Sequence, residues 1–143
     1  MNGFIYLASP FWHESELIRL QRVNQVRKAA AELMEKGYVV YAPIAHGFDI
    51  AKHLSAAHRH SHDFWMAQDL PILARAETLW VLTLDGWQQS IGVKEEIVFA
   101  TAARIPTIFT TGEAIANFAD RRDTNSPEQA ASGVRTGIPS TAR

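Results

Sequence analysis

Short apolar runs alternate with longer amphipathic stretches along the first 120 residues of the chain. The runs are rich in β-branched and aromatic residues and end at proline or polar positions, which is typical of buried parallel strands. We predict strands at 4–8, 38–43, 78–84 and 106–110. We predict helices at 14–36, 62–76, 92–104 and 113–119.

The longest amphipathic stretch separates the first two predicted strands. Its apolar residues recur every three or four positions, as expected for a helix that buries one face. These residues are Leu17, Leu20, Val23, Val26, Ala30 and Leu33. Gly37 follows where a left-handed C-cap would lie, so the helix should end near Lys36.

Two segments after the second strand interrupt the pattern. Residues 44–61 have no clean period, and we expect a long loop there with at most one irregular turn of helix. Loops of that length are often functional. In the helix predicted at 62–76, Pro71 should produce a kink or begin a new segment after Asp69, because proline lacks the backbone N–H.

The order of the elements predicts an α/β fold. We expect a three-layer sandwich with a flavodoxin-like or Rossmann-like parallel sheet of four or five strands, in the order 2-1-3-4. Residues 1–119 would form this one domain. From Asp120 onward large apolar side chains are almost absent, so residues 120–143 are predicted to be a flexible C-terminal tail.

Composition removes several classes of function. The chain has 143 residues, 47% hydrophobic and 20% charged, with a formal net charge of -1, which provides no general attraction for polymeric nucleic acid or an anionic membrane. Cysteine is absent, which excludes disulfides, zinc–thiolate sites and thiol nucleophiles. The sequence lacks a signal-like start and a long apolar run, so we expect a cytoplasmic protein with no membrane partner.

The predicted topology places a ligand site at the carboxyl ends of the first and third strands, where the strand order reverses. The loops 8–14 and 85–92 should meet there. Neither GxGxxG nor GxxxxGK[ST] occurs in the sequence, so dinucleotide and P-loop sites are unsupported.

Helical geometry separates the two adjacent glutamates that follow the second loop. At roughly 100° per residue, Glu96 lies about 60° from the sheet-facing Val93, whereas Glu95 points about 160° away from Val93 and should face water. The free N–H groups near Gly92 and Val93, beside the Ser90 hydroxyl, suit an anion. The simpler alternative is that Glu96 complements the helix dipole and Ser90 is only a cap.

Several motifs occur together in a recognisable order. They are Tyr6-Leu7-Ala8-Ser9-Pro10, Val40-Tyr41-Ala42-Pro43, Asp69, Leu84-Asp85-Gly86 and Ser90-x-Gly92-Val93-x-x-Glu96-x-x-x-Ala100. In this respect the chain, over roughly residues 4–110, resembles the nucleoside 2-deoxyribosyltransferase superfamily.

The resemblance implies N-glycosidic chemistry without a cofactor or metal. It implies that Glu96 is the nucleophile that attacks C1′ of the sugar, where a carboxylate stabilises an oxocarbenium-like transition state. It implies that Tyr6 orients this carboxylate and that Asp69 donates a proton to the leaving base. Asp85 would lie near the sugar.

One departure favours a phosphorylated substrate. Family transferases that act on free nucleosides commonly have aspartate six residues before the nucleophile, and this chain has Ser90 there. The chain is similar in this position to 2′-deoxynucleoside 5′-phosphate N-hydrolases, in which the serine contacts the 5′-phosphate. We therefore expect cleavage or transfer of the N-glycosidic bond of a (deoxy)nucleoside 5′-monophosphate. The alternative is a non-catalytic nucleotide-binding or sensing module.

Other side chains complete the set of candidates. Ser9 and Trp12, in the first loop, are candidates for substrate contacts, although Trp12 could equally pack in a core or dimer. His58, His60 and His62 are not expected to bind metal, because they share a face only in an extended segment. The resemblance also implies a homodimer or larger homo-oligomer, in which Asn117 would contact the neighbouring subunit's site.

Overall fold

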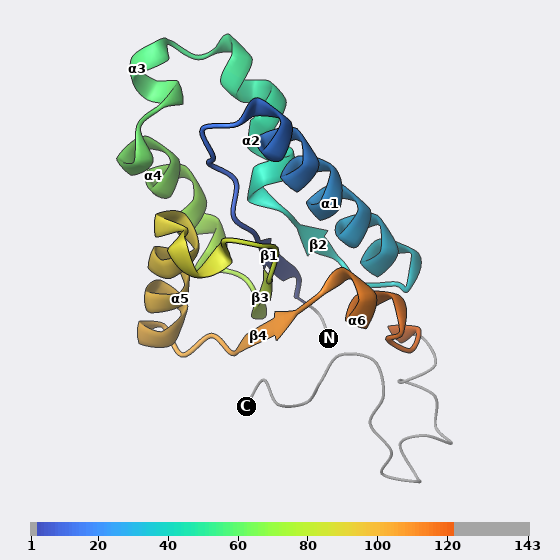
Figure 1. Ribbon diagram of the computed structural model, residues 1–143. Coiled ribbons are helices and arrows are strands. Elements are labelled where there is room, and N and C mark those ends of the chain that lie inside the picture. Colours follow the sequence, from blue (N-terminus) through green and yellow to red (C-terminus); the bar gives the residue numbers. More distant parts are fainter. Residues whose placement is uncertain (1–2, 122–143) are drawn as a thin grey trace, which may run out of the picture.

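The computed structural model describes residues 3–121, and it confirms the predicted α/β fold. Four parallel strands form one sheet in the order β2-β1-β3-β4, with helices on both faces (Figure 1). The strands are β1 (Ile5–Ala8), β2 (Val40–Tyr41), β3 (Thr78–Leu82) and β4 (Thr107–Thr110). The tail predicted at 120–143 lies, from residue 122 onward, outside the described residues.

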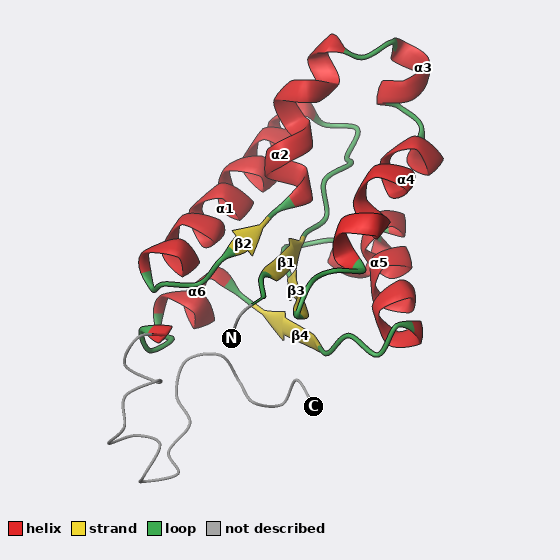
Figure 2. Ribbon diagram, turned by 180° about the vertical axis from the view of Figure 1, so that it is seen from behind, coloured by secondary structure: helices red, strands yellow, loops and turns green. Residues whose placement is uncertain are grey.

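Two groups of helices cover the sheet, one on each face (Figure 2). On one face lie α1 (Glu16–Glu35), α2 (Pro43–Ile50) and α6 (Gly112–Ala116). On the other lie α4 (His62–Leu73) and α5 (Ile91–Ala102). The short helix α3 (Ala56–Arg59) and the 3-10 turns η1 (Ala51–His53) and η2 (Trp87–Gln89) lie in the connections. Within residues 3–121, no helix is long and apolar enough to cross a membrane.

Alternating side chains of the fully buried strand β1 divide the core. Ile5 and Leu7 pack toward α1, whereas Tyr6 and Ala8 pack toward α4 and α5. A strand covered on both faces buries every residue, which explains its continuous apolar run. This alternation aims Tyr6 at the helices that carry Asp69 and Glu96.

Helix α1 begins and ends as its sequence predicts. Ser15 is the N-cap and accepts a hydrogen bond from the Ile18 N–H. Gly37 has a φ of 88°, the left-handed conformation that glycine adopts most readily. The apolar stripe is buried only from Val23 onward, because Leu17 and Leu20 lie in the exposed first half of the helix.

The loop predicted at 44–61 is wrong, because α2, η1 and α3 occupy most of it. These helices are short and depend on local caps: Pro43 begins α2, and the Ser55 side chain caps α3. Pro71 does not begin a new segment, because α4 continues past it to Leu73. Asp69 and Leu73 lie one turn apart and are both buried, and this packing favours a continuous helix.

Candidate active site

The two loops predicted to meet at the carboxyl edge of the sheet are joined by one arginine of α1. The guanidinium of Arg22 donates to the carbonyls of Phe11 (3.3 Å), Trp12 (2.7 Å) and Asp85 (2.8 Å). Gly86 makes room for it, since a Cβ there would lie 2.6 Å from an Arg22 nitrogen, and its φ is 87°. Arg22 therefore holds the two loops together at the carboxyl edge of the sheet, where the ligand site was predicted.

Glu96 points into the molecule, as its helical phase predicts. Its side chain is only 4% exposed, and the Tyr6 hydroxyl donates a hydrogen bond to its Oε2. Helix α5 starts at the end of the segment that follows β3, so its second turn places Glu96 over the neighbouring strand β1. The predicted contact between Tyr6 and Glu96 is thus present.

Asp69 and Tyr41 complete a buried polar cluster around this bond. Asp69, on α4, is 9% exposed and interacts electrostatically with Glu96. Tyr41 pairs in register with Tyr6 on the adjacent strand, and their ring centroids are 5.8 Å apart. The cluster joins two carboxyl groups and two phenols from four different elements.

Burial raises the pKa of every member of the cluster. It raises the pKa of Asp69 to about 6 and that of Tyr41 to about 12. It also raises the pKa of Glu96 to about 8, although the bond from Tyr6 opposes this effect; the charge of Asp69 adds to it. The pKa of Tyr6 lies far above its usual range, mainly through burial, so Tyr6 remains a hydrogen-bond donor. Burial therefore favours the protonated form of both carboxyl groups relative to exposed ones.

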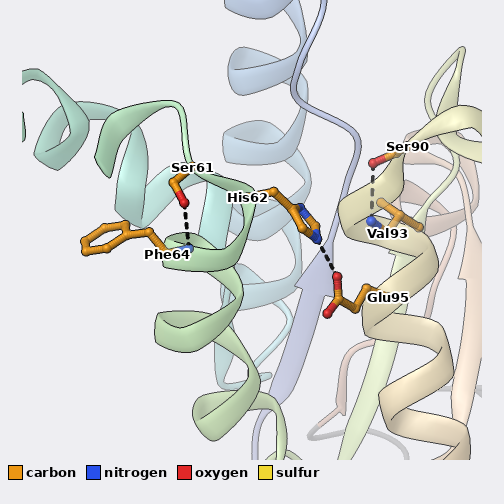
Figure 3. Close-up of polar contacts among 6 residues, drawn as sticks. All are labelled: Ser61, His62, Phe64, Ser90, Val93 and Glu95. Atoms are coloured by element: carbon orange, nitrogen blue, oxygen red, sulfur yellow. Dashed lines mark hydrogen bonds and ion pairs between the residues drawn. The ribbon is translucent and has the colours of Figure 1, made fainter. Parts of the chain in front are cut away.

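The start of α5 is a regular serine-capped helix terminus. Ser90 is the N-cap, and its Oγ accepts a hydrogen bond from the Val93 N–H at 3.2 Å (Figure 3). The Val93 N–H is therefore engaged within the helix, and the expectation that it is free is wrong. In the described part of the chain, the N–H groups of Ile91 and Gly92 have no acceptor.

A cleft of about 760 Å³ lies between α1 and residues 83–90. Of the predicted residues, Trp12, Asp85 and Ser90 line it, whereas Tyr6, Asp69 and Glu96 do not. Trp12 is 67% exposed, and Arg19 stacks on its ring at 5.0 Å.

The remaining candidates lie apart from the carboxyl pair or make no contact with it. Ser9 is buried after β1, and its Oγ has no hydrogen-bond partner among residues 3–121. Asn117 is exposed, and its amide caps the Glu113 carbonyl of its own helix. Its neighbours Ala116 and Phe118 accept hydrogen bonds from Lys36, at the far end of α1. Within the chain, Asn117 thus lies away from Glu96.

The three alternate histidines have separate partners. His58 stacks on Phe64 at 4.6 Å, and the edge of His60 faces Trp12 at 6.5 Å. His62 contacts Glu95, which is half-exposed and not simply in water as predicted (Figure 3). No cluster of three or more histidine, aspartate or glutamate side chains suited to a metal occurs in the part of the chain that the structure describes.

The set of site residues predicted from the sequence leaves out three residues with contacts in this region: Arg22, Tyr41 and His62. A signal existed for Tyr41, because it ends the strand next to Tyr6 and could share its face. The sequence carries no such signal for the contacts of Arg22 with Asp85 and of His62 with Glu95, because these partners are 63 and 33 positions away.

Comparison with known proteins gives one assignment. No curated protein matches the chain significantly. The family model described as a domain of unknown function, DUF1937, matches residues 3–112. This span includes all four strands and the residues Tyr6, Asp69 and Glu96. The chain therefore belongs to the DUF1937 family of domains of unknown function.

Proposed function

We propose that this protein cleaves or transfers the N-glycosidic bond of a (deoxy)nucleoside 5′-monophosphate, with Glu96 as the nucleophile. The observation that carries the proposal is the buried Glu96 carboxyl, which accepts a hydrogen bond from Tyr6 of β1 and interacts electrostatically with Asp69 of α4. A buried carboxyl pair costs stability, because burial disfavours its charge. Such groups cluster at active sites.

The chemistry needs one ionised and one protonated carboxyl group, and the raised pKa values of both groups make a protonated member available. The Glu96 carboxylate attacks C1′ and forms a glycosyl ester. The C1′–N bond breaks, its electron pair leaves with the base, and the proton of Asp69 passes to the base. Water then attacks C1′ with Asp69 as the base, which frees Glu96 and the sugar phosphate; a second nucleobase in place of water gives transfer.

Burial raises the pKa of Glu96 and so favours its protonated form in the unliganded protein. The proposed attack therefore requires that substrate binding favours an ionised Glu96 and a protonated Asp69.

Ser90 and Gly92 are proposed to hold the phosphate. The first turn of α5 offers two free N–H groups, and the Ser90 hydroxyl keeps its own proton for donation after accepting from Val93. Ser90 also lines the 760 Å³ cleft, together with Trp12 and Asp85. It is thus the residue that links the cleft to the helix that carries Glu96.

The alternative is a nucleotide-binding or sensing module without turnover. One observation favours it: the cleft is not lined by Glu96, Tyr6 or Asp69. A ligand confined to the cleft would touch Ser90 and Trp12 without reaching the carboxyl pair.

Release of free base tests the proposal. The protein is incubated with deoxynucleoside and ribonucleoside monophosphates and with the matching nucleosides, and free base is measured by chromatography. We expect release from a monophosphate and its loss in Glu96→Gln, which retains the shape of the side chain. Transfer is distinguished from hydrolysis by adding a second free base.

A matched control is Glu77→Gln, because Glu77 is exposed and precedes β3 at the opposite edge of the sheet. It should release base at the wild-type rate. If no substrate is cleaved while monophosphates still raise the melting temperature, the binding module is correct.

A further inference from the structure

Most of the cleft between α1 and residues 83–90 has no role in the reaction proposed above. That reaction uses Ser90, at the end of the segment that forms one wall of the cleft. The volume of about 760 Å³ lies within the range of roughly 300–1,000 Å³ that is usual for sites of whole small molecules. A phosphate group at Ser90 would fill only a small part of it. The cleft therefore has room for a further group of the ligand.

Ser90 lies between the cleft and the carboxyl pair. Helix α1, which forms the other wall of the cleft, covers the opposite face of the sheet from the helices that carry Asp69 and Glu96 (Figure 2). Ser90 precedes Glu96 by six residues of α5, which corresponds to about 9 Å along the helix. A nucleotide with its phosphate at Ser90 and its C1′ at Glu96 would span this distance. The cleft then lies on the far side of the phosphate.

Arg22 brings a positive charge to the wall of the cleft. Its guanidinium donates three hydrogen bonds to backbone carbonyls, which leaves two of the five N–H donors of an arginine unused. Arg22 forms no ion pair with a carboxylate of residues 3–121. A guanidinium with unused donors and no carboxylate partner suits a phosphate group.

The other polar side chains of the cleft suit hydroxyl groups. Gln21 and Gln25 line it from α1, and Gln89 lines it from the opposite wall. Their amides and the carboxylate of Asp85 have no hydrogen-bond partner in the described part of the chain. Amides donate and accept, and a carboxylate accepts, so together they match the hydroxyl groups of a sugar. The charge of Asp85 opposes a longer chain of phosphates, so the group beyond Arg22 should be neutral.

We propose that the substrate continues beyond its 5′-phosphate into the cleft, as a nucleoside 5′-diphosphate that carries a sugar. The first phosphate lies at Ser90, the second at Arg22, and the sugar among the three glutamines and Asp85. A nucleoside monophosphate is then the smallest form of the substrate, and the reaction at C1′ is unchanged. This inference rests on the proposed function, because that function places the first phosphate at Ser90.

The test measures ligand binding to the full-length Glu96→Gln protein, which cannot form the glycosyl ester and so leaves the ligands intact. The monophosphate, the diphosphate and the diphosphate-glucose of adenosine, guanosine, cytidine, uridine and thymidine are titrated by calorimetry. For the base that the protein accepts, we expect the affinity to rise about tenfold with the second phosphate and again with the glucose. Equal affinities within every series would overturn the inference.

A substitution within the cleft locates the added group. Gln25→Leu removes one amide at an exposed position of α1 and should weaken the binding of the diphosphate-glucose about fivefold. The loss should be confined to the ligand that carries the sugar. Gln68→Leu is the matched control, because Gln68 is an exposed residue of α4 outside the cleft. Equal weakening in the two variants, or none in Gln25→Leu, would show that the sugar does not lie in the cleft.

Failure of the proposed function would look different. If the diphosphate-glucose binds most tightly and Gln25→Leu weakens it, but the wild-type protein releases no base, the cleft site stands and only the reaction is wrong. If base is released from monophosphates and the glucose adds no affinity, the reaction stands and the extended substrate is wrong.

Discussion

Tyr6 and Tyr41 occupy paired positions on neighbouring parallel strands, yet only Tyr6 donates a hydrogen bond to Glu96. Their rings are 5.8 Å apart and lie on the same face of the sheet. Tyr41 feels the charges of Asp69 and Glu96 without a hydrogen bond to either in the described structure. The two phenols therefore provide a matched pair for testing what the hydrogen bond contributes.

Tyr6→Phe should reduce turnover more than Tyr41→Phe does. A hydrogen bond to a charged group contributes roughly 1.5–3 kcal/mol, so its loss should lower kcat by roughly 10- to 100-fold. It should also raise the pKa of Glu96 further, because the Tyr6 bond lowers that pKa. The pH dependence of kcat/KM for the two variants measures both effects. Equal profiles in the two variants would refute a specific role for Tyr6.

The free energy of unfolding should fall as pH rises from about 4 to about 8. Burial raises the pKa of Glu96 from 4.5 to about 8 and that of Asp69 from 3.8 to about 6. A group with a higher pKa in the folded state stabilises the fold fully below its unfolded pKa, and this contribution is lost as pH rises through the folded pKa.

Urea unfolding at several pH values measures this dependence. Glu96→Gln should be more stable than wild type by a few kcal/mol above pH 8 and show little advantage near pH 4. Glu77→Gln, exposed at the opposite edge of the sheet, should follow the wild-type curve. A Glu96→Gln variant with the same pH dependence as wild type would show that Glu96 ionises freely.

Arg104→Gly should stabilise the protein by about 1 kcal/mol, because Arg104 adopts a φ of 59° after α5. The Ile105 N–H there bonds to the Ala100 carbonyl at 2.8 Å, as in a glycine-capped helix end. Ala103→Gly is the control: Ala103 has right-handed helical geometry, so glycine there should destabilise. Chemical denaturation compares the two.

The elements that the sequence predicted best are those whose signal is local. The continuous apolar run predicted where β1 lies, because a strand buried on both faces accepts mainly apolar residues. Gly37 predicted where α1 ends, because the left-handed conformation of a C-cap favours glycine. Helices α2 and α3 were not predicted, because segments of eight and four residues are too short to show the helical repeat of apolar positions.

The same distinction between local and non-local information applies to the candidate site. The inward phase of Glu96 follows from helical geometry within α5, and its contact with Tyr6 is present. The pairing of Glu95 with His62 was not predicted, and Glu95 was placed in water, because that contact depends on how closely α4 approaches α5. Periodicity within one helix holds no information about the spacing between two.

The substitution Gly92→Ala should raise the stability of the protein but weaken the binding of its ligand. Gly92 lies in the first turn of α5 without a positive φ, and a Cβ there would make ordinary contacts, 3.8 Å from Met66 and 4.0 Å from Ser90. Alanine should therefore stabilise the helix by about 0.5–1 kcal/mol. Nothing within the described chain requires glycine here, which suits a position that a ligand must approach closely.

The proposed phosphate contact predicts the opposite effect on binding. The added methyl group should weaken deoxynucleoside monophosphate binding about tenfold or more and leave nucleoside binding nearly unchanged. Thr101→Ala, at an exposed position of the same helix, should add stability without a change in affinity. Calorimetric titration of both variants decides the matter: equal monophosphate affinity in Gly92→Ala and wild type would mean that the phosphate does not lie at this helix terminus.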